Sequence, residues 1–430
     1  MSERIIIEFD DEKDKKQDKA GKPEDRILIE FEDDIENKEV EETIEVEEIA
    51  ESYEEKTLKT KFNSFCLGSP YLNYFYESGI KFPEGIENSF RKRFSLNLKD
   101  EFFNKILVNN RFVILTSGKG NIYKIDRFTG KVKDKIFFEH ESFEKTGLVY
   151  DNVIYINSLN KIYRISADGE TKNEIYSSEN NFLIWSNLSR CKDSLVFTEY
   201  NRDSGQAALK IIDTGKDNEV SEYKFTVNDF VSDKICIAGN VAYALFDSEV
   251  LMYDIDKMKG EIISTDKKSG LRTDESSFIF YLNYRLFITS HLSEIYYLDL
   301  PRISGKFSFS GIRCNYINSI GGFDDNIFIG TLDGWKYYKS SGLPVYNYED
   351  EYENRIECIS RNVIVVSQKN KIIFCNLNRF QEAESYVISS EKNDGQTEII
   401  SAFISGNEIF VITKNGILES FTNDKLNIHI

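Results

Sequence analysis

The sequence predicts an all-β fold, an eight-bladed β-propeller, and three observations support this prediction. A short apolar strand returns eight times, each copy leads through a polar turn into a second strand rich in Ile and Tyr, and successive copies are 36 to 46 residues apart. A strand-only repeat with a period of about 42 residues is typical of propeller blades. The first strand of each pair begins near Val113, Val153, Leu195, Val241, Leu286, Ile327, Val363 and Ile409.

Each repeat holds enough apolar segments for four strands. A run such as ICIA (235–238) or SAFIS (401–405) precedes the pair, and segments such as KVKDKIFF (131–138) and LNIHI (426–430) supply a fourth strand. Four antiparallel strands make one propeller blade, so eight repeats predict eight blades. Seven blades are the alternative, in which one end repeat serves only to close the ring.

The residues at the turns agree with this interpretation. The turns before the repeated strand carry Asn, Asp or Gly, as at Asn109-Asn110 and Gly239-Asn240. These residues tolerate left-handed backbone, and Asn and Asp also bond to nearby backbone groups, which tight strand-to-strand turns require. The chain has 32 Phe and 24 Tyr but only five Pro, a bias that favours half-buried strands.

Charge divides the chain into three regions. The net charge is −19, and residues 1–60 hold 23 acidic and 10 basic residues, which leaves the remainder close to neutral. We expect residues 1–58 to be a disordered acidic tail, 59–100 a connector and 101–430 the propeller. Because the propeller has no broad positive field, nucleic acid is not an expected partner.

The connector contains a local helix signal. Ser69-Pro70, the segment YLNYFYES and Gly79 place an N-cap, a first-turn proline and a C-terminal glycine at helical distances. This pattern predicts one short helix over about 70–78, packed on the propeller flank or over one mouth of its channel.

Cysteines and the N-terminal residues bear on the cellular compartment. The six cysteines include no C-x-x-C pair, which argues against a zinc ribbon or redox motif, and scattered single thiols fit a reducing compartment. The N-terminal residues lack the features of a secretory signal, and no stretch approaches the length of a membrane span. We therefore expect a cytoplasmic protein.

One repeat carries a family resemblance. The segment NNRFVILTSGKGNIYKIDRFTGKVKDKI (109–136) resembles the repeat of the pyrroloquinoline-quinone-like propeller superfamily, which ends in Asp-x-x-Thr-Gly-Lys. The superfamily's enzymes hold their cofactor with a calcium ion, a stacked Trp and often adjacent cysteines, none of which can be assigned here. The resemblance thus implies the non-enzymatic branch, whose assembly factors bind partners through propeller loops, and no cofactor. The matching residues are Asp126, Thr129, Gly130 and Lys131, with a partial second copy at Asp256, Gly260 and Glu261.

No pattern of catalytic or metal-binding residues is recognisable. The common hydrolase, metalloprotease, phosphate-binding and dinucleotide-binding motifs are missing from the sequence. The histidines, His140, His291 and His429, are far apart in sequence and are interpreted as structural. Asp254 and Asp256 alternate along one strand, which predicts a solvated strand face. We therefore predict that the protein is not an enzyme and binds no metal ion.

Two further features allow two interpretations each. The basic run Arg91-Lys92-Arg93 is either a solvated strand or loop, or a docking point for the acidic tail or an acidic partner. Trp335, after the Asp333-Gly334 turn, either packs within its blade or stands exposed at a blade edge to stack on a ligand.

The tail contains a second, shorter repeat. The octamer at 4–11 recurs 22 residues later at 26–33 with six of eight positions identical, and a weaker echo lies at 43–48. Branched aliphatic residues and Phe favour an extended strand, and the acidic flank would steer that strand to a basic sheet edge. Two copies would raise avidity. The alternatives are pairing with the propeller's own edge, or no role. The predicted partner-binding residues are Ile5, Ile6, Ile7, Phe9, Ile27, Leu28, Ile29 and Phe31.

The sequence therefore predicts a non-enzymatic protein-interaction scaffold, in which the propeller surface and the tail motifs bind protein partners. The alternative is a ligand-binding or hydrolytic propeller that acts on a sugar or peptide at the channel mouth. A third interpretation is an architectural component of a larger assembly.

Overall fold

The structure is a computed structural model in which every described element is a β-strand. Two units are separated along the chain, Met1–Thr57 and Leu58–Ile430, and all described residues belong to the second. Within the described part of the chain, no helix is long and apolar enough to cross a membrane. The described residues are 76–78 and 90–423, apart from 110, 151–152, 167–170, 180, 266–269, 301–305, 324, 361–362, 370, 377–382, 388–397 and 406–407.

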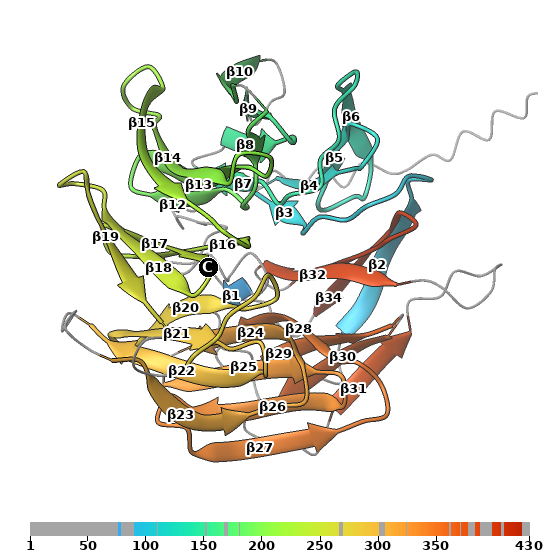
Figure 1. The fold of residues 1–430 in the computed structure, drawn as a ribbon. Helices are drawn as coiled ribbons and strands as arrows, with labels where there is room; N and C mark the ends of the chain where they lie inside the picture. The colour runs from blue at the N-terminus through green and yellow to red at the C-terminus, as the bar shows by residue number, and fades with distance from the viewer. Residues whose placement is uncertain are drawn as a thin grey trace, which may run out of the picture. The chain divides into compact units, whose positions relative to one another are not determined.

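Eight antiparallel sheets follow one another along the chain, which confirms the eight-bladed β-propeller. In blades 1, 2, 4, 5 and 6 the four strands are hydrogen-bonded in sequence order, with the first strand innermost (Figure 1). Blades 3 and 7 have a fifth strand, and blade 8 takes its outermost strand from the segment before blade 1. The eight repeated strands recognised in the sequence are the second strands of the eight blades. Neighbouring blades contact each other through their first strands, as between β3 and β7 or between β28 and β32, defined below.

The first four blades cover residues 107–264. Blade 1 contains β3 (Leu107–Val108), β4 (Phe112–Thr116), β5 (Asn121–Asp126) and β6 (Val132–Phe137). Blade 2 contains β7 (Leu148–Tyr150), β8 (Val153–Asn157), β9 (Lys161–Ser166) and β10 (Lys172–Ser177). Blade 3 contains β11 (Leu183–Ile184), β12 (Ser189–Cys191), β13 (Ser194–Asn201), β14 (Gln206–Asp213) and β15 (Glu219–Thr226). Blade 4 contains β16 (Val231–Ala238), β17 (Val241–Phe246), β18 (Glu249–Asp254) and β19 (Lys259–Ser264).

The last four blades include two strands from the connector. Blade 5 contains β20 (Ile279–Leu282), β21 (Arg285–Thr289), β22 (Glu294–Asp299) and β23 (Ser308–Arg313). Blade 6 contains β24 (Ile317–Phe323), β25 (Asn326–Thr331), β26 (Gly334–Lys339) and β27 (Pro344–Glu349). Blade 7 contains β28 (Arg355–Ser360), β29 (Val363–Gln368), β30 (Lys371–Asn376), β31 (Ala383–Val387) and the added β1 (Tyr76–Ser78). Blade 8 contains β32 (Ile399–Ser405), β33 (Glu408–Thr413), β34 (Ile417–Asn423) and the added β2 (Phe90–Asn97).

The turn between first and second strands has the predicted chemistry. The Asn109 side-chain oxygen accepts hydrogen bonds from the backbone N–H groups of Arg111, at 2.9 Å, and Phe112, at 2.6 Å. Gly239, with a φ of +61°, and Asn283, with a φ of +48°, adopt the left-handed backbone at the equivalent turns of blades 4 and 5. Asn, Asp and Gly therefore recur because this turn needs φ > 0 or a local acceptor.

The Asp-x-x-Thr-Gly-Lys segment is a structural turn between β5 and β6. The Asp126 carboxylate accepts hydrogen bonds from the Thr129 backbone N–H and hydroxyl, and Gly130 has a φ of +70°. The equivalent position in blade 4 is Asp254, which bonds to the Lys257 N–H at 3.0 Å. The predicted partial copy was aligned on Asp256, which lies two residues after the position that the structure shows to be equivalent to Asp126.

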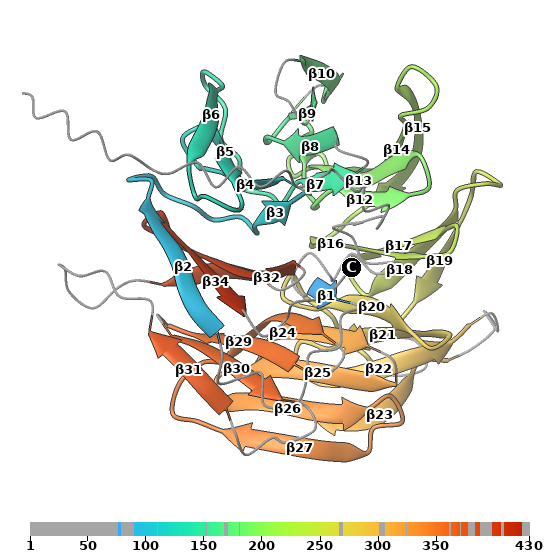
Figure 2. The ribbon, with the colours of Figure 1, turned by 180° about the vertical axis from the view of Figure 1, so that it is seen from behind.

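The helix predicted over 70–78 is wrong where the structure describes it, since Tyr76–Ser78 is strand β1. This strand runs parallel to β28, with Tyr76 opposite Cys358, and so adds a strand on the axial side of blade 7 (Figure 2). The inner edge of β28 carries unpaired backbone groups, and pairing with them satisfies polar groups in a way that a helix on the flank would not.

Strand β2 closes the ring by completing blade 8. It pairs antiparallel with β34, from Phe90 opposite Asn423 to Asn97 opposite Ile417. The predicted fourth strand at 426–430 lies outside the described residues, and the fourth position of blade 8 is held by β2 instead. The last blade therefore combines strands from both ends of the propeller sequence.

The basic run Arg91-Lys92-Arg93 lies in β2 and neutralises buried carboxylates of blade 8. Lys92 pairs with Glu419 at 2.7 Å, and Arg93 pairs with Glu408, whose side chain is only 2% exposed. Arg127 of blade 1 also binds Glu408, with a 2.6 Å N–O distance. The run is thus part of an exposed strand, as the first interpretation expected, and two of its three cations pair with buried carboxylates of blade 8.

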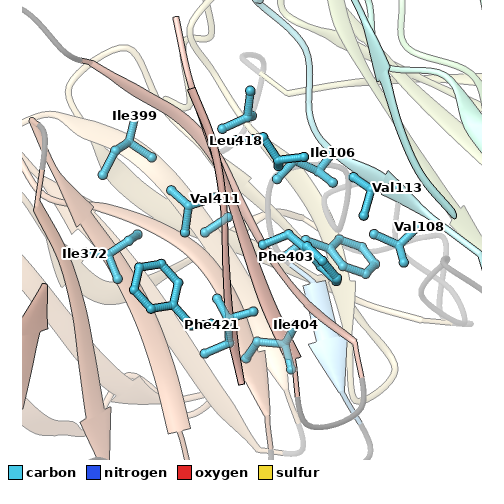
Figure 3. Packing of buried hydrophobic residues seen from close by; sticks show 14 of the residues in the cluster. Ile106, Val108, Val113, Ile372, Ile399, Phe403, Ile404, Val411, Leu418 and Phe421 are labelled. Atoms are coloured by element: carbon cyan, nitrogen blue, oxygen red, sulfur yellow. The ribbon is translucent and has the colours of Figure 1, made fainter. Parts of the chain in front are cut away.

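Apolar packing reinforces the closure. One buried cluster joins blades 7, 8 and 1, and Figure 3 shows Ile106 and Val113 of the blade 1 region close to Leu418 of blade 8. The β2 residue Phe90 contacts Phe374 of blade 7 with ring centroids 4.9 Å apart. A Cβ added to Gly130 would lie 2.6 Å from the ring of Phe94, so this glycine makes room for β2 beside blade 1.

We expect removal of β2 to destabilise the propeller strongly. A chain that begins at Leu98 loses Lys92, the ion-pair partner of Glu419, and exposes the edge of β34. The free energy of unfolding should fall by about 3 kcal/mol or more, because an ionised side chain is left buried without its partner. Denaturant unfolding followed by circular dichroism measures the difference.

The matched control is a chain that begins at Phe90, which keeps β2 but lacks β1. Equal stability of the two truncated chains would contradict the role of β2 in closing the ring.

Candidate functional site

One face of the propeller carries two kinds of loop. In an antiparallel four-stranded meander, the turn between the second and third strands lies at the same end as the connection to the next blade. We call this end the connection face. Its inner part surrounds the propeller axis, where the first strands begin, and its outer part is formed by the turns.

A buried carboxylate on β28 joins three blades at the inner part of the connection face. Glu357 contacts Lys105, just before β3, at 2.8 Å and Arg355 on its own strand at 2.6 Å. The Arg355 guanidinium also donates to the backbone oxygens of Ile399 and Ile400 in blade 8. Blades 7, 8 and 1 are therefore linked around one anion.

A second cluster joins blades 2 to 5 in a similar way. Asp233 of β16 lies 3.1 Å from the Lys234 amine and 3.6 Å from the amine of Lys145, which precedes β7. Lys234 also donates to the backbone oxygen of Glu275, at 3.2 Å. Lys145 thus reaches across blade 3, just as Lys105 reaches across blade 8.

In both clusters the neighbouring cations stabilise the ionised form of the carboxylate. Burial by itself would raise the pKa of Glu357, but Arg355 and Lys105 outweigh burial and hold that pKa below its usual range. The pKa of Asp233 is lowered in the same way, because Lys234 and Lys145 outweigh its burial. Carboxylates of this kind are weak bases and poor proton donors near neutral pH, so they suit structural anchoring better than general acid–base chemistry.

The outer part of the connection face exposes large apolar side chains on three consecutive blades. Leu292 lies in the β21–β22 turn and Leu332 in the β25–β26 turn, whereas Tyr316 and Tyr352 lie in the connections into blades 6 and 7. We call these four residues the apolar arc. Their exposed fractions are 64% for Leu292, 49% for Tyr316, and 44% for both Leu332 and Tyr352.

The sequence-predicted residues are not brought together at one site. The eight partner-binding residues of the tail, Ile5 to Phe31, lie outside the described residues, as does His429. Trp335 is 1% exposed and packs on Tyr346 and Tyr348, so the stacking interpretation is wrong.

Other candidates have local structural partners. Asp254 is bound to Lys257, and Asp256 to Lys192, on the exposed side of blade 4. His291 is exposed, with its ring nitrogen 3.1 Å from the backbone oxygen of Arg272. Among the described residues no group of three or more His, Cys, Asp or Glu side chains is placed to hold a metal ion.

Neither the Glu357 and Asp233 clusters nor the apolar arc was predicted from the sequence. Charged residues do precede or interrupt the apolar first strands, as in RIECIS (355–360) and DKICIA (233–238). A charge in a segment that is otherwise buried is the signal that would have identified Glu357 and Asp233. The partners of these two residues come from other blades, and no local pattern indicates them.

Comparison with known proteins shows the fold alone. No family model matches the sequence, and no curated protein matches it. Among solved structures, the computationally designed protein Ika8 is similar with a TM-score of 0.59 and 13% identity, over 77% of this chain and 99% of that chain. BamB from Moraxella catarrhalis is similar with a TM-score of 0.55 and 11% identity over the same shares. This chain is an eight-bladed β-propeller. At these identities, nothing further about function follows from the likeness.

We expect the Glu357 cluster to make stability depend on pH. The folded-state pKa of Glu357 is held below the ordinary 4.5, so the carboxylate stabilises the fold fully above that pH and loses its effect as pH falls further. Glu357→Gln should lower the free energy of unfolding by about 3 kcal/mol at pH 7, since two cations lose their partner. The difference from the unaltered protein should shrink as the pH is lowered below 4.5.

Denaturant unfolding at a series of pH values measures this difference, and Glu351→Gln, at an exposed position, is the control. A difference that does not change with pH, or a similar loss in the control, would contradict this account of the cluster.

Proposed function

We propose that this protein is a non-enzymatic interaction scaffold, whose connection face and N-terminal tail motifs bind protein partners. The observation that carries the proposal is the apolar arc. Four large side chains, each at least 44% exposed, occur on consecutive loops of one face, where a soluble protein normally scatters such residues singly.

The rigid frame beneath the arc supports this role. Backbone hydrogen bonds join the loops, since Cys314 N–H donates to Ser293 O at 3.1 Å and Asp350 N–H donates to Asp333 O at 3.0 Å. The Glu357 cluster anchors β28 immediately after the Tyr352 connection. A preorganised surface loses little conformational entropy on binding, so exposed apolar groups on it are effective contact residues.

The absence of enzymatic activity is part of the proposal. Glu357 and Asp233 each contact two cations that lower the pKa of the carboxylate, so both stay ionised near neutral pH and neither serves as a proton donor for hydrolysis. The hydrolytic alternative would need two carboxylates with separated pKa values, or a His–carboxylate pair, facing one cavity. A cytoplasmic location belongs to the same proposal.

The tail contributes a second binding mode in this proposal. Its duplicated motif offers Ile5, Ile7 and Phe9, and then Ile27, Ile29 and Phe31, in a pattern suited to strand addition. Acidic residues flank both copies, so the fitting partner is a protein with an exposed, basic sheet edge.

We expect the apolar arc to be required for partner capture by the full-length protein. A variant with Leu292→Ser, Tyr316→Ser, Leu332→Ser and Tyr352→Ser should lose the proteins that co-purify through this face, because apolar anchors dominate interface energies. Quantitative mass spectrometry of affinity-purified material measures the loss.

The control variant carries Met258→Ser, Tyr284→Ser and Leu343→Ser, which alter side chains 63–74% exposed on the opposite face. Identical partner sets for the arc variant, the control and the unaltered protein would overturn the assignment of function to the connection face.

We expect a peptide of residues 1–35 to capture partners through its apolar residues. Changing Ile6, Phe9, Leu28 and Phe31 to Ser removes side-chain contacts while keeping the charge, so recovery should fall about tenfold or more. Equal recovery by the two peptides would contradict strand addition. A peptide with only the second motif altered separates the effect of avidity from that of a single copy.

A further inference from the structure

The loop between β27 and β28 combines an arc residue with a run of carboxylates. Residues 349–353 read Glu-Asp-Glu-Tyr-Glu, and Glu349, Glu351 and Glu353 are exposed on either side of Tyr352. Asp350 accepts hydrogen bonds from Gln368 at 2.6 Å and from Tyr348, and Glu353 accepts one from Asn318 at 3.0 Å. Neutral donors therefore hold this loop in place.

These carboxylates differ from Glu357 and Asp233 in having no cationic partner in the part of the chain that the structure describes. Within the described residues, none of the four forms an ion pair at 4.0 Å or less, whereas Glu357 and Asp233 each contact two cations. The negative charge of the loop thus remains directed to the outside of the protein. Unneutralised charge beside exposed apolar groups favours a partner of opposite sign.

The tyrosines of the arc suit the same partner. The Lys369 amine lies 4.2 Å from the centre of the Tyr352 ring, so the face of this ring already accepts a cation in the folded protein. Tyr316 is 49% exposed and lies in the preceding connection. A phenol ring attracts ammonium and guanidinium groups through its quadrupole, and the effect adds to apolar contact.

The arc and the acidic loop form one continuous surface. The Ile317 N–H donates to the Ser293 hydroxyl, which links the connection of Tyr316 to the turn of Leu292. The Asn354 N–H donates to Thr331 O at 2.9 Å, which links the connection of Tyr352 to the turn of Leu332. Apolar anchors and carboxylates from blades 5, 6 and 7 are therefore held in fixed relation.

We propose that the apolar arc and the acidic loop 349–353 together bind a cationic protein segment, rich in Lys or Arg, that carries one or more large apolar side chains. This inference rests on the proposed scaffold function and specifies the chemistry of its partner. The apolar side chains of the segment contact Leu292 and Leu332, and its cations pair with Glu351 and Glu353 and lie over the ring of Tyr316.

The test uses the full-length protein and two short synthetic peptides as probes. One peptide alternates Lys with Leu and Tyr, and the other has Glu in place of every Lys. Fluorescence anisotropy should show binding of the basic peptide alone, with an affinity that falls as salt is added, because exposed charges are screened. The double variant Glu351→Lys and Glu353→Lys should bind the basic peptide about tenfold more weakly.

A matched control separates a local effect from one of net charge. Glu139→Lys and Glu144→Lys make the same charge change on the same face, in the connection from blade 1 to blade 2, and should leave binding within about twofold. Circular dichroism checks that both variants fold.

Three results would overturn the inference: equal binding of the two peptides, no effect of reversing Glu351 and Glu353, or an equal effect of the control reversal. If the arc variant loses its co-purified partners while charge reversal changes nothing, the partner chemistry is wrong and the scaffold function stands. If the arc variant also keeps its partners, the scaffold proposal fails as well.

Discussion

The ring depends on an ion-pair network in which both ends of the propeller sequence meet. Glu408 of β33 is almost fully buried, and its carboxylate is held by Arg93 of β2 and Arg127 of blade 1. Removing the Glu408 carboxylate would leave the nearly buried Arg127 without its ion-pair partner, which costs several kcal/mol. Because β2 and blade 1 both contact β33 of blade 8 through this carboxylate, the network holds the ring closed at the point where the two ends of the propeller sequence meet.

The cost of burying a charge without a partner also separates the charged residues that stabilise the fold from those available for binding. Buried anions at the blade junctions and around the axis have cations within the fold, as Glu357 has in Lys105 and Arg355. Three of the four carboxylates of loop 349–353 are exposed, and the hydrogen bonds that the loop's carboxylates accept from described side chains come from neutral donors. Desolvation enforces pairing in the first group and not in the second, which leaves the second free to interact with other molecules.

Sequence reasoning succeeded where the signal is local. The period of the second strands and the turn chemistry at Asn109 and Asp126 depend on neighbours within a few residues, and both agree with the structure. It failed for Tyr76–Ser78, where an aromatic-rich segment with helical end signals pairs with β28 instead. It also left Trp335 open, since burial depends on Tyr346 and Tyr348 packing over the ring. Tertiary pairing overrides local propensity in such segments.

By itself, the sequence determined the place of each second strand and the composition of the turns, because a repeat of about 42 residues forces the same local pairing each time. It predicted eight blades, with seven as the alternative. Only the tertiary structure decided that β2 completes blade 8, that Lys105 reaches Glu357, and that Leu292, Tyr316, Leu332 and Tyr352 share one face. These relations join residues from different blades. Ring closure sets their distances, and no periodicity along the chain encodes them.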